Sequence, residues 1–381
     1  MKRIGFLLGI FMIGSILFAC DSKVVPLEKP LSPEALTQVA AKEPWQVKWD
    51  KTLEVSGKEG KVVLYASTGA AAAREMLIKN MRDKYGLDLE VVTGRGAEMN
   101  QKLFSERKAG LYLADVYIGG PTTIITEFIP AGIFDPVEEV LILPEVYDPK
   151  YWRGNKLHFI DKGRLVIRWA ANVNQPLAIN TSLVRVEEMT SYTDLLNPKW
   201  KGKIMMNDPS ATGNGQDFFY FVGMKMMGLD FMRQLAKQEP VILRDQRLLV
   251  EWLANGKYAI ATGSLPDPVL QYRSEGAPVM LLNYMKEGGY ISGGAVQIGL
   301  MNKAPHLNAS TVFINWLLSR EGQMSWSAVQ SDSSLRIDIP TDNLYPGKIP
   351  DPSKKYIEED EEGLKEKGKT PALAREIFNI K

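Results

Sequence analysis

The 381-residue chain has 46 basic and 45 acidic residues, two histidines and one cysteine. This balanced charge gives no electrostatic footprint for nucleic acid, and a single cysteine excludes a disulfide within the chain. His158 and His306 lie far apart, and neither falls at metal-ligand spacing with Cys or Glu. Because histidine is the commonest acid–base residue, its scarcity argues against an enzyme. The length predicts two domains, and the scarce histidines and missing metal motifs lead us to expect no enzyme, no metal and no cofactor.

Residues 1–19 are predicted to be a secretory signal peptide. Lys2 and Arg3 are followed by 16 uncharged, mostly apolar residues, fewer than the about 20 that a membrane-spanning helix needs. The sequence LFAC at residues 17–20 resembles the lipobox of bacterial lipoproteins. This resemblance implies a lipid on Cys20 that anchors the chain to the cell membrane, on the periplasmic face if the cell has two membranes. An uncleaved signal anchor with an incidental cysteine is the alternative.

Residues 20–59 are predicted to be a lipidated tether. Pro26, Pro30, Pro33 and Pro44 interrupt any helix, and charged residues are interspersed among them. The alternating large side chains of residues 45–49 allow part of this arm to dock on the folded body. The folded body is expected to begin at about residue 60.

From there, short apolar runs alternate with helix-forming stretches. The run at 62–66 is typical of a buried strand, and the polar residues 67–69 then open a helix. The expected strands are 62–66, 87–92 and 114–118, and the expected helices are 70–84, 97–108 and 122–129. This alternation predicts an α/β fold with a parallel sheet between helices.

A second α/β unit follows the first. Its expected strands are 203–206, 241–243 and 258–262, and its expected helices are 215–227 and 246–254. The segments 164–180 and 290–301, which are rich in strand formers, are predicted to connect the two units. Residues 309–318 form the pattern of an amphipathic helix.

The chain from about residue 340 is predicted to be a solvated, charged surface. Its acidic run at 358–362 is expected to face water. Residues 363–370 fit the phosphate-loop pattern letter by letter, but the acidic run stands where such a loop needs a buried strand, and Pro371 follows. We therefore expect no nucleotide site there.

Several segments, in order, resemble the solute-binding proteins of ABC importers, in the branch that includes ferric-iron binders. The strongest matches are LLNPKWKGK at 195–203 and FINWLLSREGQ at 313–323. The others are KVVLYA at 61–66, KYGLDL at 84–89, ADV at 114–116, AGIFDP at 131–136, PLAIN at 176–180 and NDPS at 207–210. The resemblance extends over about residues 60–330.

This resemblance implies a two-lobed α/β fold of the periplasmic-binding-protein type 2 class, with a ligand cleft between the lobes. Lobe 1 would comprise 60–165, completed by 300–381, and lobe 2 would comprise 166–299 with the crossover strands. The implied partners are a small-molecule ligand and an ABC permease with its ATPase. The chain would act as a monomer whose lobes close about a hinge.

Three segments rich in Ser, Thr and Gly follow predicted strands, where open α/β sheets bind ligands. Each segment opens a helix, and helix N-termini offer free N–H groups to anions and polar oxygens. Ordinary N-capping is the alternative role for each segment. Asp267, after the strand at 258–262, is a further candidate. The candidate ligand-binding residues are Ser67, Thr68, Gly69, Gly120, Thr122, Ser210, Thr212, Gly213, Asn214 and Asp267.

The segment 263–267 bears on the choice of solute. Ferric binders of the resembled branch place two adjacent tyrosines here, whereas this chain has GSLPD and no adjacent tyrosines anywhere. A small oxyanion, or a phosphorylated or polyol-bearing anion, is therefore expected. Ferric iron is an alternative, as is a polyamine, which Asp267, Trp169 and Tyr220 would suit. A sensory lipoprotein or an enzyme on the same scaffold is an alternative of another class.

Overall fold

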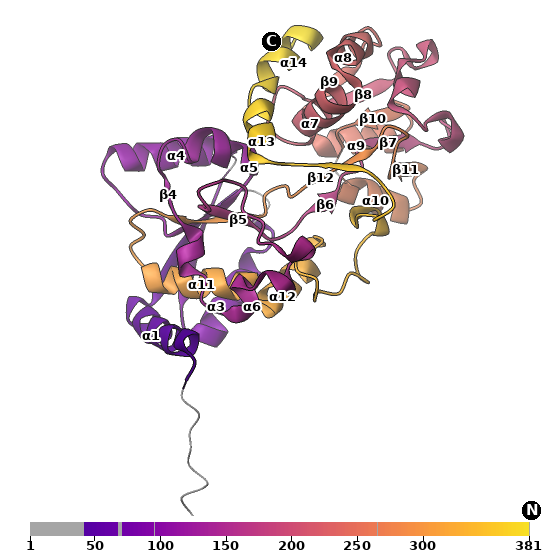
Figure 1. Ribbon diagram of the computed structural model, residues 1–381. Helices are drawn as coiled ribbons and strands as arrows, with labels where there is room; N and C mark the ends of the chain where they lie inside the picture. The colour runs from indigo at the N-terminus through magenta and orange to yellow at the C-terminus, as the bar shows by residue number, and fades with distance from the viewer. Residues whose placement is uncertain (1–41, 68–70, 95, 265, 381) are drawn as a thin grey trace, which may run out of the picture. The chain divides into compact units, whose positions relative to one another are not determined.

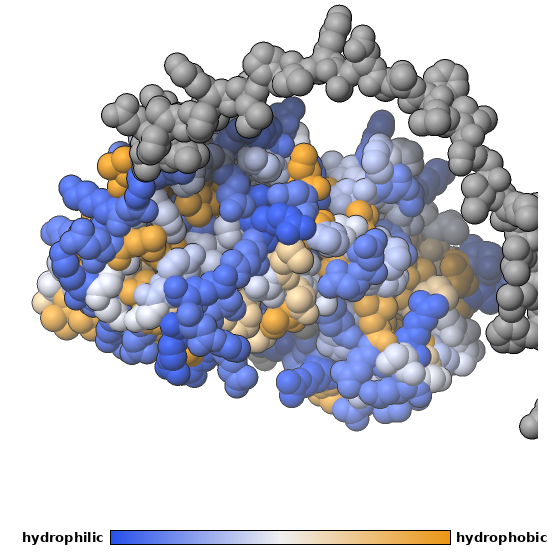
Figure 2. Space-filling model, turned by 90° about the horizontal axis from the view of Figure 1, so that it is seen from below, coloured by the Kyte–Doolittle hydropathy of each residue, from blue (hydrophilic) through white to orange (hydrophobic). Residues whose placement is uncertain are grey.

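The computed structural model describes residues 42–67, 71–94, 96–264 and 266–380 (Figure 1). Residues 43–381 belong to one compact unit. The predicted signal peptide, Cys20 and the first part of the tether lie outside the described residues. Among the residues described, no helix is both long and apolar enough to cross a bilayer. On the face shown in Figure 2, hydrophilic side chains predominate and apolar ones are scattered among them.

The central strands of the first sheet are buried on both faces. Its strands run in the order β2 (Asp88–Thr93), β1 (Lys61–Ala66), β3 (Val116–Gly119), β13 (Gln297–Met301) and β4 (Phe134–Asp135), and β5 (Val166–Arg168) also pairs with β13. β1 is parallel to β2 and β3, whereas β13 is antiparallel to β3. Leu64 packs in one core cluster with Phe313, and Tyr65 packs in another with Phe128. Because successive strand residues point to opposite faces, a strand covered on both sides must be apolar throughout.

Helices cover this first sheet. They are α3 (Arg74–Tyr85), α4 (Gly96–Lys108), α11 (Leu307–Leu318) and α12 (Arg320–Gln330). α11 is buried nearly all round, not on one face as the amphipathic pattern predicts: ten of its residues, from Ala309 to Leu318, are buried. It is covered by the sheet, by α12 and by the N-terminal helix, which explains the composition.

The second sheet has the order β11 (Val279–Leu282), β7 (Leu177–Asn180), β10 (Ile260–Thr262), β8 (Ile204–Asn207) and β9 (Val241–Leu243). β8 is parallel to β10 and β9, and β7 is antiparallel to β10 and β11. Its helical segments are α7 (Asn214–Asp217), the π-helical η9 (Phe218–Met227), α8 (Leu229–Ala236), α9 (Gln246–Ala254) and α10 (Pro266–Ser274). Two helix-covered sheets confirm the prediction of a two-lobed α/β fold.

The two predicted connections pair with each other in a third, small sheet. β6 (Asn172–Val173) runs antiparallel to β12 (Gly289–Ser292), and β14 (Tyr356–Glu358) lies parallel to β12. In chain order, β6 leads into the second sheet and β12 leads into β13 of the first. Both connections therefore pass through one small sheet.

Short helical segments fill the remaining loops. Several begin with proline, whose missing N–H has no partner in a first helical turn anyway. They are α5 (Pro121–Thr123), η2 (Ile124–Phe128), η3 (Val137–Val140), α6 (Pro144–Tyr147), η4 (Pro149–Tyr151), η5 (Arg153–Asn155), η6 (Val186–Glu188), η7 (Tyr192–Leu196), η8 (Pro198–Trp200) and η10 (Pro346–Lys348).

The end of the predicted tether is a helix. α1 (Pro44–Glu59) packs on α11, with Trp49 and Leu53 against the core of the first lobe. Pro44 occupies the first helical turn, where it does not interrupt hydrogen bonding. The folded body therefore begins before residue 60. The predicted boundary is too late because Pro44 starts a helix instead of interrupting one.

The C-terminal segment, residues 346–380, also differs from the prediction. α13 (Glu361–Lys367) contacts α5 and η2 in the first lobe, whereas α14 (Thr370–Phe378) contacts α8 and η9 in the second (Figure 1). Leu364 is buried beside Phe128, and Ala374 is buried in the core of the second lobe. Residues 300–381 therefore do not belong to the first lobe alone.

The contact between Glu59 and the start of α11 generates a stability prediction. The Glu59 carboxylate accepts hydrogen bonds from the backbone N–H groups of Asn308 (3.2 Å) and Ala309 (2.7 Å). Glu59→Ala should lower the free energy of unfolding by about 1 kcal/mol, the usual cost of losing a helix cap. Urea unfolding of the purified protein measures this change.

Glu54→Ala provides the matched control on the same helix. The Glu54 side chain is exposed and contacts only Lys58 one turn away, so its loss should change stability by a few tenths of a kcal/mol at most. Equal destabilisation by the two substitutions would show that Glu59 does not cap α11.

Candidate functional site

Two adjacent cavities lie between polar loops of the protein, and the larger of the two has a volume of about 720 Å³. This larger cavity lies where strands of both sheets end. β1 leads into Ser67, β3 leads into Gly120, and β8 leads into the loop at 211–214, and all of these line the cavity. Parallel strands bring their carboxyl ends to one edge of a sheet, so the topology gathers these polar loops together. The other lining residues are Asn100, Tyr117, Pro121, Thr122, Thr123, Glu127, Gln216, Asp217, Arg244, Ser292, Gly294, Ala295, Glu359 and Lys367.

Two glycines shape the loop after β8. A Cβ on Gly215 would overlap the carbonyl oxygens of Asn207 and Asp208, so the loop can lie against the strand only if this residue has no side chain. The Gly215 N–H donates to Asn207 Oδ1 at 3.0 Å. Gly213 has a φ of 137°, which residues with a side chain rarely adopt. These constraints fix where Thr212 and Asn214 meet the cavity.

Most of the predicted site residues that the structure describes meet at this cavity. Thr68 and Gly69 lie outside the described residues. Asp267 lines a second, adjacent cavity instead. The predicted residues that line the larger cavity are Ser67, Gly120, Thr122, Thr212, Gly213 and Asn214. Their binding of a ligand stays a prediction.

Ser210 is the exception among the predicted residues. Its side chain is buried, and both its hydroxyl (2.7 Å) and its backbone N–H (2.8 Å) donate to Asp208 Oδ1. Asp208 Oδ2 in turn accepts from Arg244 Nε at 2.7 Å. Ser210 therefore closes a local Asp turn of the kind that Asp favours, and it does not line either cavity.

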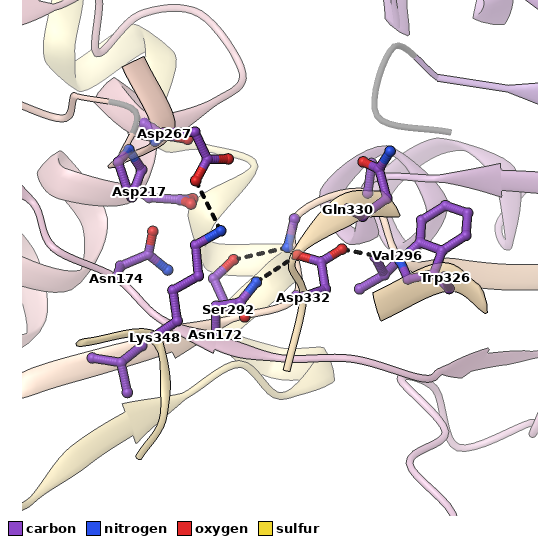
Figure 3. Close-up of a pocket in the computed structure, with 16 residues that line it drawn as sticks. Asn172, Asn174, Asp217, Asp267, Ser292, Val296, Trp326, Gln330, Asp332 and Lys348 are labelled. Carbon is purple, nitrogen blue, oxygen red and sulfur yellow. Dashed lines mark hydrogen bonds and ion pairs between the residues drawn. The ribbon is translucent and has the colours of Figure 1, made fainter. Parts of the chain in front are cut away.

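The smaller cavity, about 220 Å³, shares Asn214, Asp217 and Ser292 with the larger one. Figure 3 shows the Lys348 side chain extending toward Asp267, with their ion pair drawn as a dashed line. Lys348 Nζ lies 2.9 Å from Asp267 Oδ1. The sequence predicts that Asp267 faces a ligand, whereas in the structure it contacts a lysine of the C-terminal segment.

A buried row of alternating charges lies beside both cavities. Arg168 Nη2 donates to Glu359 Oε2 (2.7 Å), and Lys367 Nζ donates to Glu359 Oε1 (2.6 Å) and to Asp217 Oδ1 (2.8 Å). All four side chains are at most 13% exposed. These residues, Arg168, Glu359, Lys367 and Asp217, are called the charge row below.

The opposite charges of Lys367 and Glu359 stabilise each other within this row. Burial by itself would lower the pKa of Lys367, but the Asp217 and Glu359 carboxylates raise it above its ordinary value. Burial would likewise raise the pKa of Glu359, but Lys367 and Arg168 hold it below its usual range. The lysine and this glutamate therefore stay ionised at neutral pH.

Sequence patterns miss the charged residues that the C-terminal segment brings to the cavities. The prediction places Glu359 and Lys367 in a solvated tail, but burial against the two lobes gives them partners far away in the sequence. Asp217 carried a usable signal, because it stands one helical turn after Asn214. Glu127, whose carboxylate accepts from Asn100 Nδ2 at 2.9 Å, similarly stands one turn after Thr123.

Metal ligands are sparse in the described part of the chain. No group of three or more His, Cys, Asp and Glu side chains there is placed to hold a metal ion. Tyr117, a tyrosine that lines the larger cavity, is buried, and burial raises the pKa of its hydroxyl. A protonated phenol is a poor ligand for ferric iron, which prefers anionic oxygen.

The model of one protein family, the bacterial extracellular solute-binding proteins, matches residues 76–346. This chain belongs to that family. The resemblance in the sequence is thereby confirmed, and the protein is a solute-binding protein that acts outside the cytoplasm. The match ends two residues before Lys348, so the last part of the C-terminal segment lies beyond it.

Two relatives and one solved structure are similar to this chain at low identity. An uncharacterised protein of Haemophilus influenzae is 24% identical over 292 residues, covering 74% of this chain and 80% of that protein. Iron uptake protein A1 of a Synechocystis species is 23% identical over 291 residues, covering 71% and 74%. The structure of the periplasmic binding protein AfuA of Actinobacillus pleuropneumoniae, with fructose-6-phosphate bound, has a TM-score of 0.60 at 20% identity, covering 84% and 97%. This last likeness shows the shared fold.

The charge row generates a second stability prediction. Lys367→Met should lower the free energy of unfolding by about 3–5 kcal/mol, because the Asp217 carboxylate would stay buried without its cation and Glu359 would keep only Arg168. Chemical denaturation monitored by circular dichroism measures the loss.

Lys369→Met is the matched control. Lys369 lies two residues along the chain but is exposed, so removing its charge should change stability by no more than about 0.5 kcal/mol. A similarly small change for Lys367→Met would show that the charge row does not hold the C-terminal segment to the lobes.

Proposed function

We propose that this protein is the solute-binding component of an ABC importer. It captures a small phosphorylated or polyol-bearing anion by closure of its two lobes and delivers it, as a monomer, to a permease and its ATPase. The observation that carries the proposal is the larger cavity, which loops at the carboxyl ends of strands in both sheets line with polar groups. Membership of the extracellular solute-binding family supports a role in transport.

The lining of the larger cavity suits a ligand that both accepts and donates hydrogen bonds. Thr122 and Thr212 offer hydroxyls, and the first turns that begin at Pro121 and Asn214 have N–H groups without partners inside the helix, of which that of Gly215 donates to Asn207. Such groups accommodate the oxygens of an anion. Glu127 offers a carboxylate, which accepts hydrogen bonds from sugar hydroxyls. A phosphorylated sugar combines both kinds of group, and AfuA, of similar fold, has fructose-6-phosphate bound.

Ferric iron is the alternative suggested by the name of the Synechocystis relative. The sparse metal ligands among the described residues favour the anion over iron. A polyamine would use the acidic side chains of the two cavities, above all Glu127 in the larger and Asp267 in the smaller. These three ligand classes differ in charge and are separated by a direct binding experiment.

A thermal-shift screen followed by calorimetry tests the ligand class. Hexose phosphates, citrate, polyamines and ferric citrate are each added to the purified protein. A binding anion at a hundred times its Kd should stabilise the fold by about 2.7 kcal/mol, and the melting temperature should rise by a few degrees. Stabilisation by polyamines or by iron alone would contradict the anion proposal.

Thr212→Val should weaken binding of the active compound by about tenfold or more, since a hydrogen bond to a charged group contributes about 1.5–3 kcal/mol. Thr212 is exposed in the cavity, so the substitution should leave the fold intact. Thr181→Val, at an exposed threonine that lines neither cavity, is the control and should bind normally. Unchanged affinity of Thr212→Val would remove this residue from the site.

We also propose that a lipid on Cys20 holds the protein to the membrane. Cys20→Ala should abolish labelling by a fatty-acid analogue and release the protein from the membrane fraction, because no described helix can span a bilayer. Labelling of intact cells followed by fractionation gives both results. Equal labelling of the wild type and the variant would contradict the lipid anchor.

A further inference from the structure

The smaller cavity contains a buried cation that lies beyond the matched family region. The Lys348 side chain is 6% exposed and lines the cavity with Asn174 and Ser292 (Figure 3). The lysine belongs to η10, and the carbonyl of its neighbour Gly347 accepts a hydrogen bond from the buried Gln175. Lys348 is thus a desolvated ammonium on an anchored stretch of backbone.

The Lys348 ammonium has one neutral and one charged partner. Its Nζ donates to the Ser331 carbonyl at 3.1 Å, which satisfies one N–H without adding charge. Its carboxylate partner, Asp267, comes from α10 of the second lobe and is 68% exposed. An ion pair with so exposed a partner contributes little net free energy, because water already solvates the carboxylate well. A ligand anion can therefore replace Asp267 at small cost.

The other carboxylates at this cavity are directed to other donors. Asp332 accepts hydrogen bonds from Asn172 Nδ2 (2.7 Å) and Trp326 Nε1 (3.0 Å). Asp217 is paired with Lys367 in the charge row. With Asp267 displaced, Lys348 is the lining cation left without a carboxylate in direct contact. The cavity then offers an ammonium beside the neutral polar groups of Asn174 and Ser292, with the Asp332 carboxylate near enough to interact with its charge.

We propose that Lys348 binds the anionic group of the solute, a phosphate or a carboxylate. Asp267 forms its ion pair with Lys348 only while no solute is bound. The inference rests on the proposed function and adds to it the position of the ligand's charge. Because the two cavities share Asn214, Asp217 and Ser292, the hydroxylated part of the same solute would lie in the larger one. Asp267 thereby acts as a stand-in for the ligand anion.

Isothermal titration calorimetry with fructose 6-phosphate, citrate and putrescine tests this inference. The proteins are the wild type, Lys348→Met, Asp267→Asn and, as the matched control, Lys354→Met, whose lysine lies on the same segment outside both cavities. Lys348→Met should weaken binding of the anion by about tenfold to a hundredfold. Asp267→Asn should instead tighten it several-fold, because the competing carboxylate is gone. Lys354→Met should bind as the wild type does.

The outcomes separate the inference from the proposed function. If the wild type binds an anion and Lys348→Met binds it equally well, the inference fails and the proposed function stands. If Asp267→Asn weakens anion binding, the stand-in role is wrong. If only putrescine binds, and Asp267→Asn abolishes it, both fail. If Lys348→Met does not fold, Lys348→Arg replaces it, keeps the positive charge and should retain anion binding. The affinity of Asp267→Asn for the anion then decides the inference. An affinity equal to or weaker than that of the wild type overturns it.

Discussion

The buried charge row is the interaction on which the arrangement of this protein depends. It runs from Arg168 on β5 of the first sheet, through Glu359 and Lys367 of the C-terminal segment, to Asp217 on α7 of the second lobe. Buried ion pairs add little net stability, but breaking one by removing a partner is costly. The row therefore acts mainly through specificity: a C-terminal segment seated elsewhere would leave Arg168 or Asp217 buried without its opposite charge.

The cavities follow from this arrangement together with the sheet topology. Loops at the carboxyl ends of β1, β3 and β8 bring small and hydroxyl-bearing side chains to the larger cavity. The C-terminal segment adds Glu359 and Lys367 there, and adds Lys348 to the smaller cavity. The region shared with the family thus supplies most of the neutral polar groups and most of the carboxylates, whereas the segment beyond the family match supplies two of the three lining cations, Lys348 and Lys367.

The charged side chains of the C-terminal segment bear on which solute the cavities can bind. Neutral hydroxyls and backbone N–H groups can bind many different polar ligands, because each hydrogen bond to an uncharged group contributes only about 1 kcal/mol. A desolvated charge discriminates more sharply, since it must be matched by an opposite charge or left unpaired. Proteins of this family that share the lobes but differ in the C-terminal segment would therefore bind different solutes in similar clefts.

The sequence by itself determined the α/β class, the two lobes and six of the residues that line the larger cavity. Apolar runs such as 62–66 and the Ser, Thr and Gly residues that follow them are local signals, and strand topology turns these local signals into a shared position. Only the tertiary structure decided that α1 docks on α11 and that Asp267 contacts Lys348. The charge row escaped the sequence for the same reason: a Glu or Lys in a charged stretch looks solvated until partners 150 or more residues away, such as Asp217 for Lys367 and Arg168 for Glu359, are brought to it by folding.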